Sequence, residues 1–292
     1  MDFLANQARF NKDTRERWDH YRSHRNKVTD LIAQIGDQRG ERAGSLAILG
    51  AGNGNDLEVQ SLADRFDKIH LFDFDPEALS SLGRRHLNVP RIRASVVVEP
   101  PVDLSGIAGE LIQIRESSIT ESDILTLAAK ARNPQAVLPQ QSFDVVVSSC
   151  MLSQLLAAVV DSLGNESPFK DFMMIAVRDG HLDLMSRLLK PGGCGLLVTD
   201  FVSSDTLPEI READSEDSVL QLSRRAIDEK NFFTGTNPWA VKKSLSRLLV
   251  EDPLGSWTIS RPWRWQIGDT RFYLVTALIF SKPDSHAKLG QS

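Results

Sequence analysis

The sequence predicts an α/β protein with a doubly wound, mostly parallel sheet of seven strands, an antiparallel C-terminal strand and a helical N-terminal extension. Three observations support this fold class. Short apolar runs alternate with longer segments of helical periodicity along most of the chain. A glycine-rich turn directly follows the first apolar run. The last two runs are joined by Gly268-Asp269, a turn typical of an antiparallel hairpin.

The first half of the chain shows one long helical stripe and then alternating strands and helices. Continuous periodicity from Arg9 to Ile35 predicts a single helix, and Pro76 occupies a position that favours a helix start. The elements predicted after the long helix are a strand at 45–49, a helix at 56–66, a strand at 68–74, a helix at 76–86 and a strand at 91–98.

The second half continues the alternation and ends in the hairpin. The continuous apolar run Phe143–Ser149 suits a parallel strand covered on both faces. The other predicted elements are two helices within 104–141, helices at 151–162 and 169–189, a strand at 195–199, helices at 218–230 and 238–250, and strands at 257–266 and 271–280. We therefore expect an extension at 1–44, a domain at 45–283 with insertions near 104–141 and 205–250, and a flexible tail at 284–292.

Composition agrees with a folded protein and disfavours some partners. The chain has 292 residues, of which 41% are hydrophobic and 25% charged, as in globular proteins. Its net charge of −5 disfavours a bulk electrostatic attraction to nucleic acid. However, six acids and one arginine in the segment 205–217 also sum to −5. The rest of the chain therefore has a formal net charge of zero, and the total says little about the whole surface.

Cysteine content and hydropathy indicate a cytoplasmic protein with no membrane partner. Two cysteines, Cys150 and Cys194, are too few for a disulfide framework or a cysteine-rich zinc module. The first residues have scattered charges and lack the apolar region of a signal peptide. No window approaches 18 uninterrupted apolar residues, which argues against a membrane span.

The glycine-rich turn is the first functional signal. Gly50, Gly52 and Gly54 follow a strand and precede a helix, so backbone N–H groups and the positive end of the helix can face a ligand. The dinucleotide fingerprint requires a third glycine where this chain has Asn55, and no Gly-Lys-Ser/Thr follows. NAD, FAD and a P-loop nucleotide are therefore disfavoured.

An acid at the end of the second strand makes the signal more specific. Asp73 lies 19 residues after Gly54, where a carboxylate can accept hydrogen bonds from the hydroxyls of a ribose. The glycine turn and this acid together predict a nucleoside-containing ligand.

Four segments, in this order and spacing, resemble the class I S-adenosylmethionine-dependent methyltransferases over residues 45–200: LGAGNGND, LFDFDPEAL, FDVVVSSCMLSQL and LLKPGGCGLLVTD. The hairpin TRFYLVTALIFSKP is similar to the antiparallel strands that complete that sheet, and GAGNGNDL with VDLSGI resembles a bacterial small-molecule subgroup. The resemblance implies a Rossmann-like methyltransferase fold, S-adenosyl-L-methionine as cofactor, and metal-free in-line methyl transfer to an O, N or S atom of a small molecule.

The resemblance also implies roles for particular residues. Asp73 would hold the ribose, and Phe74 would lie against the adenine. Asp103, or alternatively Glu99, would meet the adenine amino group. The residues expected around the methionine moiety and the neighbouring pocket wall are Gly50, Ala51, Gly52, Gly54, Asp56, Ser148 and Ser149. Cys150 is not expected to be a nucleophile, because the cytosine-C5 enzymes of this class use a Pro-Cys pair and Ser149 precedes this cysteine.

A general base is needed only where the acceptor arrives protonated, and Tyr21, His24 and His181 are the candidates. The chain lacks the Asn/Asp-Pro-Pro-aromatic motif of amine methylation on adenine or glutamine, and the Asp-Asn pair of the magnesium-dependent catechol type. No metal site is therefore expected. The aromatic insert 232–239 is expected to form a substrate lid. The acidic segment 205–217 would favour a cationic acceptor if it faced the pocket.

Two alternatives to a small-molecule enzyme stay open. One is a protein that binds S-adenosylmethionine or S-adenosylhomocysteine without catalysis. The other is an RNA methyltransferase, because residues 9–27 carry a net charge of +4 with Trp18 and Tyr21 interleaved, a pattern that could clamp a strand. Nucleic acid is nevertheless not the expected partner, and the sequence predicts neither the acceptor nor an oligomeric state.

Overall fold

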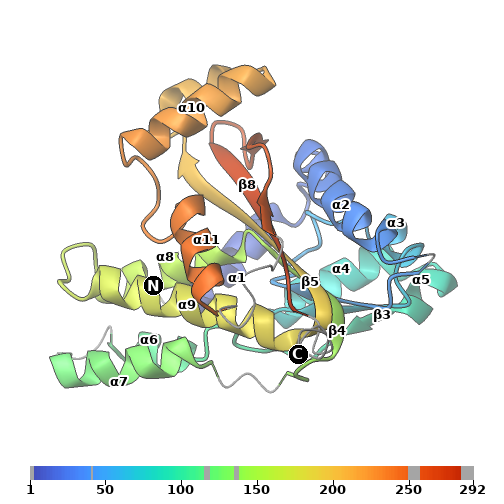
Figure 1. Cartoon of the computed structure of the whole chain (residues 1–292), viewed down its shortest axis with the longest axis horizontal. Coiled ribbons are helices and arrows are strands. Elements are labelled where there is room, and N and C mark those ends of the chain that lie inside the picture. The colour runs from blue at the N-terminus through green and yellow to red at the C-terminus, as the bar shows by residue number, and fades with distance from the viewer. Residues whose placement is uncertain (1–2, 41, 115–118, 135–137, 249–256, 284–292) are drawn as a thin grey trace, which may run out of the picture.

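The structure, a computed structural model, describes residues 3–40, 42–114, 119–134, 138–248 and 257–283. These residues form a mixed sheet in the order β3-β2-β1-β4-β5-β8-β6, and β7 also pairs with β8 (Figure 1). The strands are β1 (Ser45–Leu49), β2 (Lys68–Phe72), β3 (Val96–Val98), β4 (Phe143–Ser149), β5 (Leu189–Ser203), β6 (Trp257–Ile259), β7 (Trp263–Gln266) and β8 (Phe272–Ser281). The predicted α/β class and doubly wound, mostly parallel sheet are confirmed.

The chain winds outward in both directions from the centre of the sheet. β1 pairs in parallel with β2 on one side and with β4 on the other, so the winding direction reverses between β1 and β4. The carboxyl ends of the parallel strands meet at one edge, where doubly wound proteins bind their ligands. β8 runs antiparallel to β5 and completes the sheet.

Helices cover both faces of the sheet. The first face carries α2 (Arg22–Asp37), α3 (Val59–Ala63), α4 (Pro76–His86) and α5 (Pro90–Ser95). The opposite face carries α6 (Ala108–Ile114), α7 (Glu121–Arg132), α8 (Met151–Leu163), α9 (Lys170–Leu188) and α11 (Pro238–Leu248). Successive residues of β4 contribute to different faces, since Val146 packs with the second set of helices and Val147 with the first.

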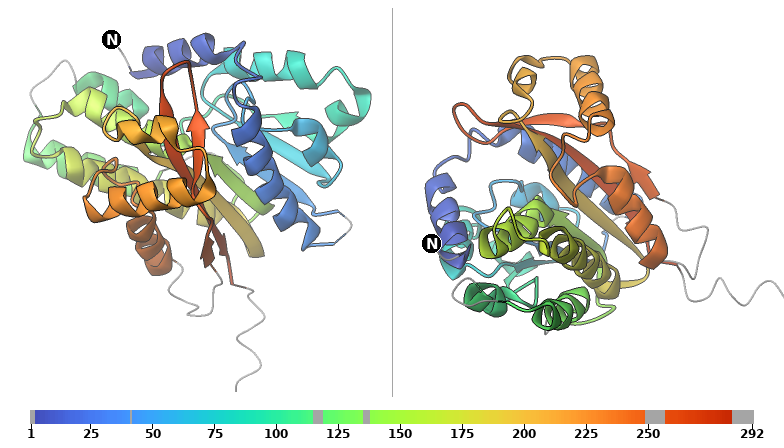
Figure 2. Two further views of the ribbon diagram at one scale, coloured as in Figure 1. Left: turned by 90° about the horizontal axis from the view of Figure 1, so that it is seen from above. Right: turned by 90° about the vertical axis from the view of Figure 1, so that its left-hand side faces the viewer.

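Three elements lie outside these two layers. α1 (Phe3–Thr14) crosses the carboxyl edge of the sheet beside α4 and α8 (Figure 2). A 3₁₀ turn, η1 (Pro208–Glu212), and α10 (Glu216–Asp228) pack around the ends of β5 and β8, where Phe201, Ile210 and Leu274 form a separate small core. The predicted N-terminal helical extension is thus present.

The prediction of one helix from residue 9 to 35 is wrong, because the chain turns between α1 and α2. Trp18 lies in this turn with the Arg25 guanidinium carbon 3.5 Å from its ring centre and that of Arg85 5.1 Å away. Arg25 also donates a hydrogen bond to the Trp18 carbonyl oxygen at 2.7 Å. These cation–π and hydrogen-bond contacts replace helical bonds and hold α1 and α2 in different directions.

Two further predicted elements need correction. The segment 91–98 is mostly the short helix α5, which begins at Pro90, and only Val96–Val98 pair as a strand. The predicted strand 257–266 is divided into β6 and β7, so the sheet has eight described strands and not seven. The division includes Pro262, which has no N–H to donate to the ladder.

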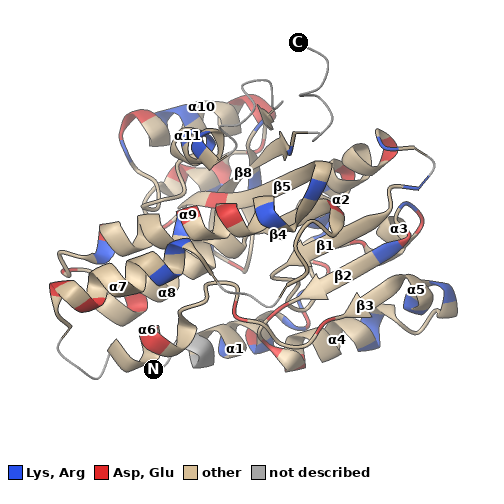
Figure 3. Cartoon of the chain, turned by 60° about the horizontal axis from the view of Figure 1, so that its bottom comes forward, with Lys and Arg blue, Asp and Glu red and all other residues tan. Residues whose placement is uncertain are grey.

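The predicted tail at 284–292 and the end of the predicted helix 238–250 lie outside the described residues. Among the helices that are described, none combines the length and apolar character needed to cross a membrane. Acidic and basic residues are interspersed along the visible elements in Figure 3, and neither sign dominates that view.

Candidate functional site

Two adjoining clefts lie at the carboxyl edge of the parallel strands. The first cleft is lined by the β1–α3 loop, by the segments after β2 and β3, by the end of β4 and by α1. The second cleft is lined by α1, α8, the end of β5, the 233–234 segment and β8. Residues that line both clefts mark their junction: Gln7, Phe10, Cys150, Gln154 and Trp265.

The glycine loop forms the base of the first cleft. Gly50, Gly52 and Gly54 have φ values of +75°, +50° and +68°, in the left-handed region that favours glycine. A Cβ atom at position 54 would lie 2.7 Å from Leu82 Cδ1, so packing also requires glycine there. At position 52 a Cβ would meet Asn11 Oδ1 at 3.6 Å, which leaves the backbone approachable from the cleft.

Asp73 is fixed beside this loop. Its Oδ2 accepts a hydrogen bond from the Gly52 N–H at 2.8 Å, and its Oδ1 accepts one from the Asp75 N–H at 2.9 Å. Burial raises the pKa of Asp73, although these backbone donors oppose the shift. The two bonds use part of the accepting capacity of the carboxylate and orient it in the cleft wall.

Phe74 and Asp103 also line the first cleft, whereas Glu99 does not. Glu99 Oε1 instead lies 2.7 Å from His70 Nδ1. Asp103 Oδ1 accepts from the Ser105 N–H at 2.8 Å, and its Oδ2 accepts from the Ala108 N–H at 2.9 Å. The geometry therefore favours Asp103 over Glu99 as a group that can face a ligand.

The two serines at the end of β4 point to opposite faces of the sheet. Ser149 lines the first cleft, and its hydroxyl donates to Asp56 Oδ2 at 3.2 Å. Ser148 is fully buried, and its Oγ lies 2.8 Å from Nε2 of the buried His181. The structure thus brings Ser149 and Asp56 to the cleft but leaves Ser148 and His181 in the core, because side chains alternate along a strand.

Asp56 has an unusual environment within the first cleft. Its Oδ1 is buried and makes no hydrogen bond within the described residues, although Nε2 of His24 lies 3.7 Å away. Burial raises the pKa of Asp56 to about 7, and the charge of Asp200 adds to the shift. A buried carboxylate oxygen at a cleft that lacks a close hydrogen bond can accept one from a ligand.

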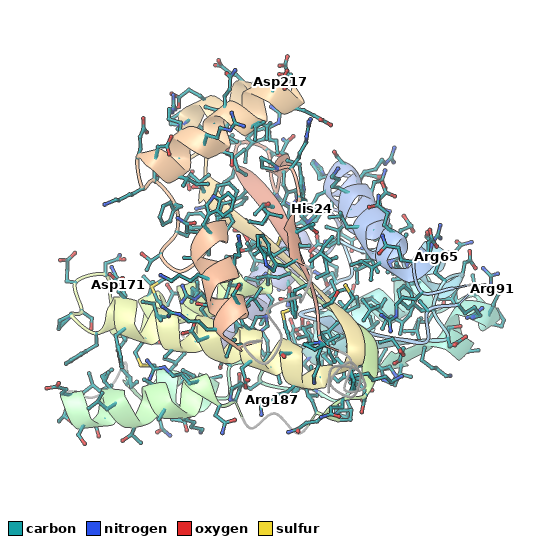
Figure 4. The ribbon with its side chains drawn as sticks, viewed as in Figure 1. His24, Arg65, Arg91, Asp171, Arg187 and Asp217 are labelled. Atoms are coloured by element: carbon teal, nitrogen blue, oxygen red, sulfur yellow. The ribbon has the colours of Figure 1, made fainter. Side chains whose placement is uncertain are left out.

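His24 lies behind the cleft wall, not in it. Trp263 Nε1 donates to His24 Nδ1 at 3.1 Å, and since an indole N–H can only donate, the neutral ring carries its proton on Nε2. His24 stacks on Trp265 with ring centres 4.2 Å apart, and burial lowers its pKa to about 3. Figure 4 shows His24 between α2 and the C-terminal strands. This histidine is placed to support Trp265 and is not exposed to either cleft.

Tyr21 is the one of the three predicted base candidates that lines the first cleft. Its ring packs edge-on against Trp265 at 5.3 Å between centres. Burial and the nearby charge of Asp56 raise the pKa of Tyr21 far above its ordinary value. The hydroxyl therefore stays protonated at neutral pH and can act as a hydrogen-bond donor.

Cys150 occupies the turn from β4 into α8 with a left-handed backbone, at φ +50°. Its side chain lies at the junction of the clefts, within electrostatic reach of Asp56 and Asp200. Burial and these two acids raise the pKa of Cys150 well above its ordinary value, so the group is a thiol and not a thiolate. This agrees with a lining role.

Asp200 is the principal group that sequence reasoning missed. It lies at the carboxyl end of β5 in the second cleft, and its Oδ1 accepts from the Ser153 hydroxyl at 2.6 Å. Burial raises its pKa to about 6. A signal was available, because LLVTD places an acid at a strand end just as LFDFD does. Tyr273 and Trp265, which also line this cleft, gave no such signal.

α1 covers both clefts and is tied to the glycine loop. Asn53 donates to the Asn11 carbonyl oxygen at 2.6 Å, and Asn55 donates to the Thr14 carbonyl oxygen at 2.8 Å. Asn11 in turn donates to Asp75 Oδ2 at 2.8 Å. Asn55, which stands where the dinucleotide fingerprint has its third glycine, therefore holds the covering helix.

The remaining sequence features have other roles. In the acidic segment, Asp205 pairs with Arg271 at 2.6 Å and Glu209 with Arg225 at 2.7 Å, and no residue of 205–217 is among those that line the second cleft. In the basic segment 9–27 the rings of Trp18 and Tyr21 contact Arg25 and Trp265, which disfavours their stacking on RNA bases. No group of three His, Cys, Asp or Glu side chains in the described ranges could hold a metal ion.

No family model and no curated protein matches the sequence. Solved structures similar to this chain include the N-methyltransferase NodS from Bradyrhizobium japonicum WM9, with 14% identity, 91% of this chain and 98% of that chain covered, and a TM-score of 0.43. NodS in complex with S-adenosyl-L-homocysteine is 15% identical, with 90% and 87% covered and a TM-score of 0.42. A SAM-dependent methyltransferase from Aquifex aeolicus is 11% identical, with 86% and 88% covered and a TM-score of 0.40. Similarities at such low identities and TM-scores do not establish an activity, so an inference about activity has to come from the two clefts themselves.

Proposed function

We propose that the chain is an S-adenosyl-L-methionine-dependent methyltransferase that acts on a small molecule. One observation carries the proposal. The glycine loop after β1, Asp73 after β2 and Asp103 after β3 line one cleft, and this cleft meets a second one at Cys150. A methyl donor and an acceptor can therefore approach each other from separate clefts at one junction.

The first cleft fits the donor chemically. The Gly52 backbone in the lining and the Asp56 carboxylate, whose Oδ1 makes no close hydrogen bond, suit the polar, positively charged amino-acid end. The oriented Asp73 carboxylate suits two ribose hydroxyls, and the half-buried Phe74 ring offers an apolar surface to the adenine. Asp103 or the backbone beside it would meet the adenine edge. Ala51, Gly50, Gly54 and Ser149 complete this part of the wall.

The bound donor supplies a methyl group already activated on a sulfonium, so the chain has mainly to position the acceptor and exclude water. Phe10 and Gln7 of α1 line the junction, and Trp265 of β7 lines it as well. Closure of the junction by these side chains shields the reacting atoms.

Incubation of the chain with methyl-labelled S-adenosylmethionine and a small-molecule metabolite extract tests the activity. We expect label to pass to a low-molecular-weight product, and the Asp73→Ala variant to lose this transfer. Label recovered solely in an added RNA fraction would support the RNA methyltransferase alternative. Tight cofactor binding without any transfer across extracts would support a non-catalytic binding protein.

A further inference from the structure

We propose that the second cleft takes an amine as the methyl acceptor, bound as its ammonium, and that Asp200 removes the proton from the nitrogen before methyl transfer. This inference rests on the proposed function and names the substrate class of the same site. Asp200 belongs to neither the predicted base candidates nor the first cleft.

Asp200 has the position that such a base needs. Its side chain lines the second cleft, yet the residue is 6% exposed, so the carboxylate sits at the inner end and not at the mouth. The Ser153 hydroxyl orients it with a hydrogen bond of 2.6 Å to Oδ1. Both residues are close to Cys150, which Ser153 contacts through a hydrogen bond to the Cys150 carbonyl oxygen at 3.3 Å. The carboxylate is therefore next to the junction at which methyl transfer would occur.

The surroundings of Asp200 favour a cation over an anion. Aromatic rings line the cleft: Tyr273 packs against Phe233 and Trp265 with ring centres 6.2 Å and 5.7 Å apart. Aromatic faces attract ammonium groups, and a desolvated carboxylate attracts them more strongly. An anionic acceptor would be repelled by the carboxylate of Asp200.

The basic residues of the second cleft do not cancel this preference. Arg271 is exposed and pairs with Asp205 at 2.6 Å, and Arg9 is exposed on α1. Lys170 donates to the Asn165 carbonyl oxygen at 2.9 Å. The Arg271 guanidinium carbon lies 5.5 Å from the ring centre of Tyr273, and exposed Asp13 and Asp161 line the same cleft as these cations. Among the charged residues that line this cleft, Asp200 is buried, whereas the others are exposed or half-buried.

The proton and electron balance of the step is simple. The ammonium gives one proton to the Asp200 carboxylate and becomes a neutral amine with a free lone pair. That lone pair forms the new N–C bond while the S–C bond of the sulfonium donor breaks and its electron pair stays on sulfur. The products are the methylated ammonium and a neutral thioether, and the Asp200 proton is released to solvent. The pKa of Asp200, raised to about 6 by burial, makes it a better proton acceptor than an ordinary carboxylate while it stays ionised at neutral pH.

Isothermal calorimetry with 2-phenylethylamine tests this inference on the full chain at pH 7.5, with and without saturating S-adenosylhomocysteine. The probe joins an ammonium to one aromatic ring, and 2-phenylethanol and 3-phenylpropionate are its neutral and anionic counterparts. We expect the amine to bind at least tenfold more tightly than either counterpart. This preference is measured on the unaltered chain, so it does not depend on whether a variant folds.

The Asp200→Asn variant then assigns the preference to one residue. We expect it to lose at least tenfold in amine affinity and to keep S-adenosylhomocysteine affinity within twofold. The matched control is Asp171→Asn, an exposed acid at the start of α9, which should leave both affinities unchanged. Equal binding of the amine and the alcohol, or an unchanged amine affinity in Asp200→Asn, would overturn the inference. Failure of S-adenosylhomocysteine to bind would instead overturn the proposed function, and the titration without it still reports on Asp200.

Discussion

The two clefts differ in how they are built. The first depends on backbone turns close together in sequence, with a glycine loop after β1 and the Asp73 carboxylate bonded to the Gly52 N–H. The second depends on side chains brought from distant segments, such as Asp200 of β5 and Tyr273 of β8 against Phe10 of α1. A site of the first kind can be recognised as a local motif, whereas a site of the second kind requires the fold.

The largest expected effect tests the backbone construction of the first cleft. Gly54→Ala combines a left-handed φ of +68° with a Cβ position 2.7 Å from Leu82 Cδ1. We expect it to lower the free energy of unfolding by about 3 kcal/mol through backbone strain and overpacking. Denaturant unfolding followed by circular dichroism measures the loss.

Gly52→Ala is the matched control for that change. Position 52 has a similar positive φ, but its added Cβ would meet Asn11 Oδ1 at an ordinary 3.6 Å. Its cost should therefore be limited to strain, about 1 kcal/mol. Equal losses in the two variants would show that contact with Leu82 does not matter.

The next effect separates the cleft wall from the core at the end of β4. Ser148→Ala removes the partner of His181 Nε2, whose Nδ1 already has no partner in the described part of the chain. We expect a loss of about 2 kcal/mol in stability and no change in S-adenosylhomocysteine affinity. Thermal unfolding and calorimetry on the same samples measure both.

Ser149→Ala should show the reverse pattern. Ser149 lines the first cleft and donates to Asp56, so its removal should weaken S-adenosylhomocysteine binding by about threefold with little change in stability. If Ser148→Ala instead weakened binding more than Ser149→Ala, the assignment of faces at this strand end would be wrong.

A further effect concerns pH and the second cleft. The groups that face Asp200 are Ser153, Cys150, Tyr273 and, at longer range, Asp56 and Arg271. Because the pKa of Asp200 is raised to about 6, its carboxylate is ionised above that pH and becomes protonated below it. The affinity for 2-phenylethylamine should therefore fall about tenfold from pH 7 to pH 5. Asp200→Asn should flatten this dependence, and an unchanged slope in that variant would assign the titration to another group.

Much of the fold and of the first cleft could be predicted because the signals are local. β1, β4 and α4 have the predicted bounds. α4 begins at Pro76, and the side chain of the preceding Asp75 caps the helix by accepting a hydrogen bond from the Glu77 N–H. The glycine loop and Asp73 lie together, as their positions after two neighbouring parallel strands predict. Each of these inferences uses residues within one strand–turn–helix unit.

The features that the sequence could not predict depend on contacts between distant segments. The break between α1 and α2 depends on Arg85 of α4 as well as on Arg25. Arg85 lies outside the segment 9–35, so the periodicity of that segment could not reveal its contact. Whether His24 and His181 line a cleft depends on the direction in which each ring points. Hydrogen bonds with Trp263 and with Ser148, respectively, hold these rings away from the two clefts. Asp200 was visible as an acid at a strand end, but its cleft exists only when α1 and β8 are in place.

The most direct test of the central claim is a calorimetric titration of the chain and its Asp73→Ala variant with S-adenosylhomocysteine, with Asp171→Ala as control. The structure places the Asp73 carboxylate in the first cleft, oriented by the Gly52 and Asp75 N–H groups. Loss of two charge-assisted hydrogen bonds to ribose hydroxyls should weaken binding about 100-fold in Asp73→Ala, and the control should bind like the unaltered chain. No binding to the unaltered chain, or equal affinity in Asp73→Ala, would contradict the account.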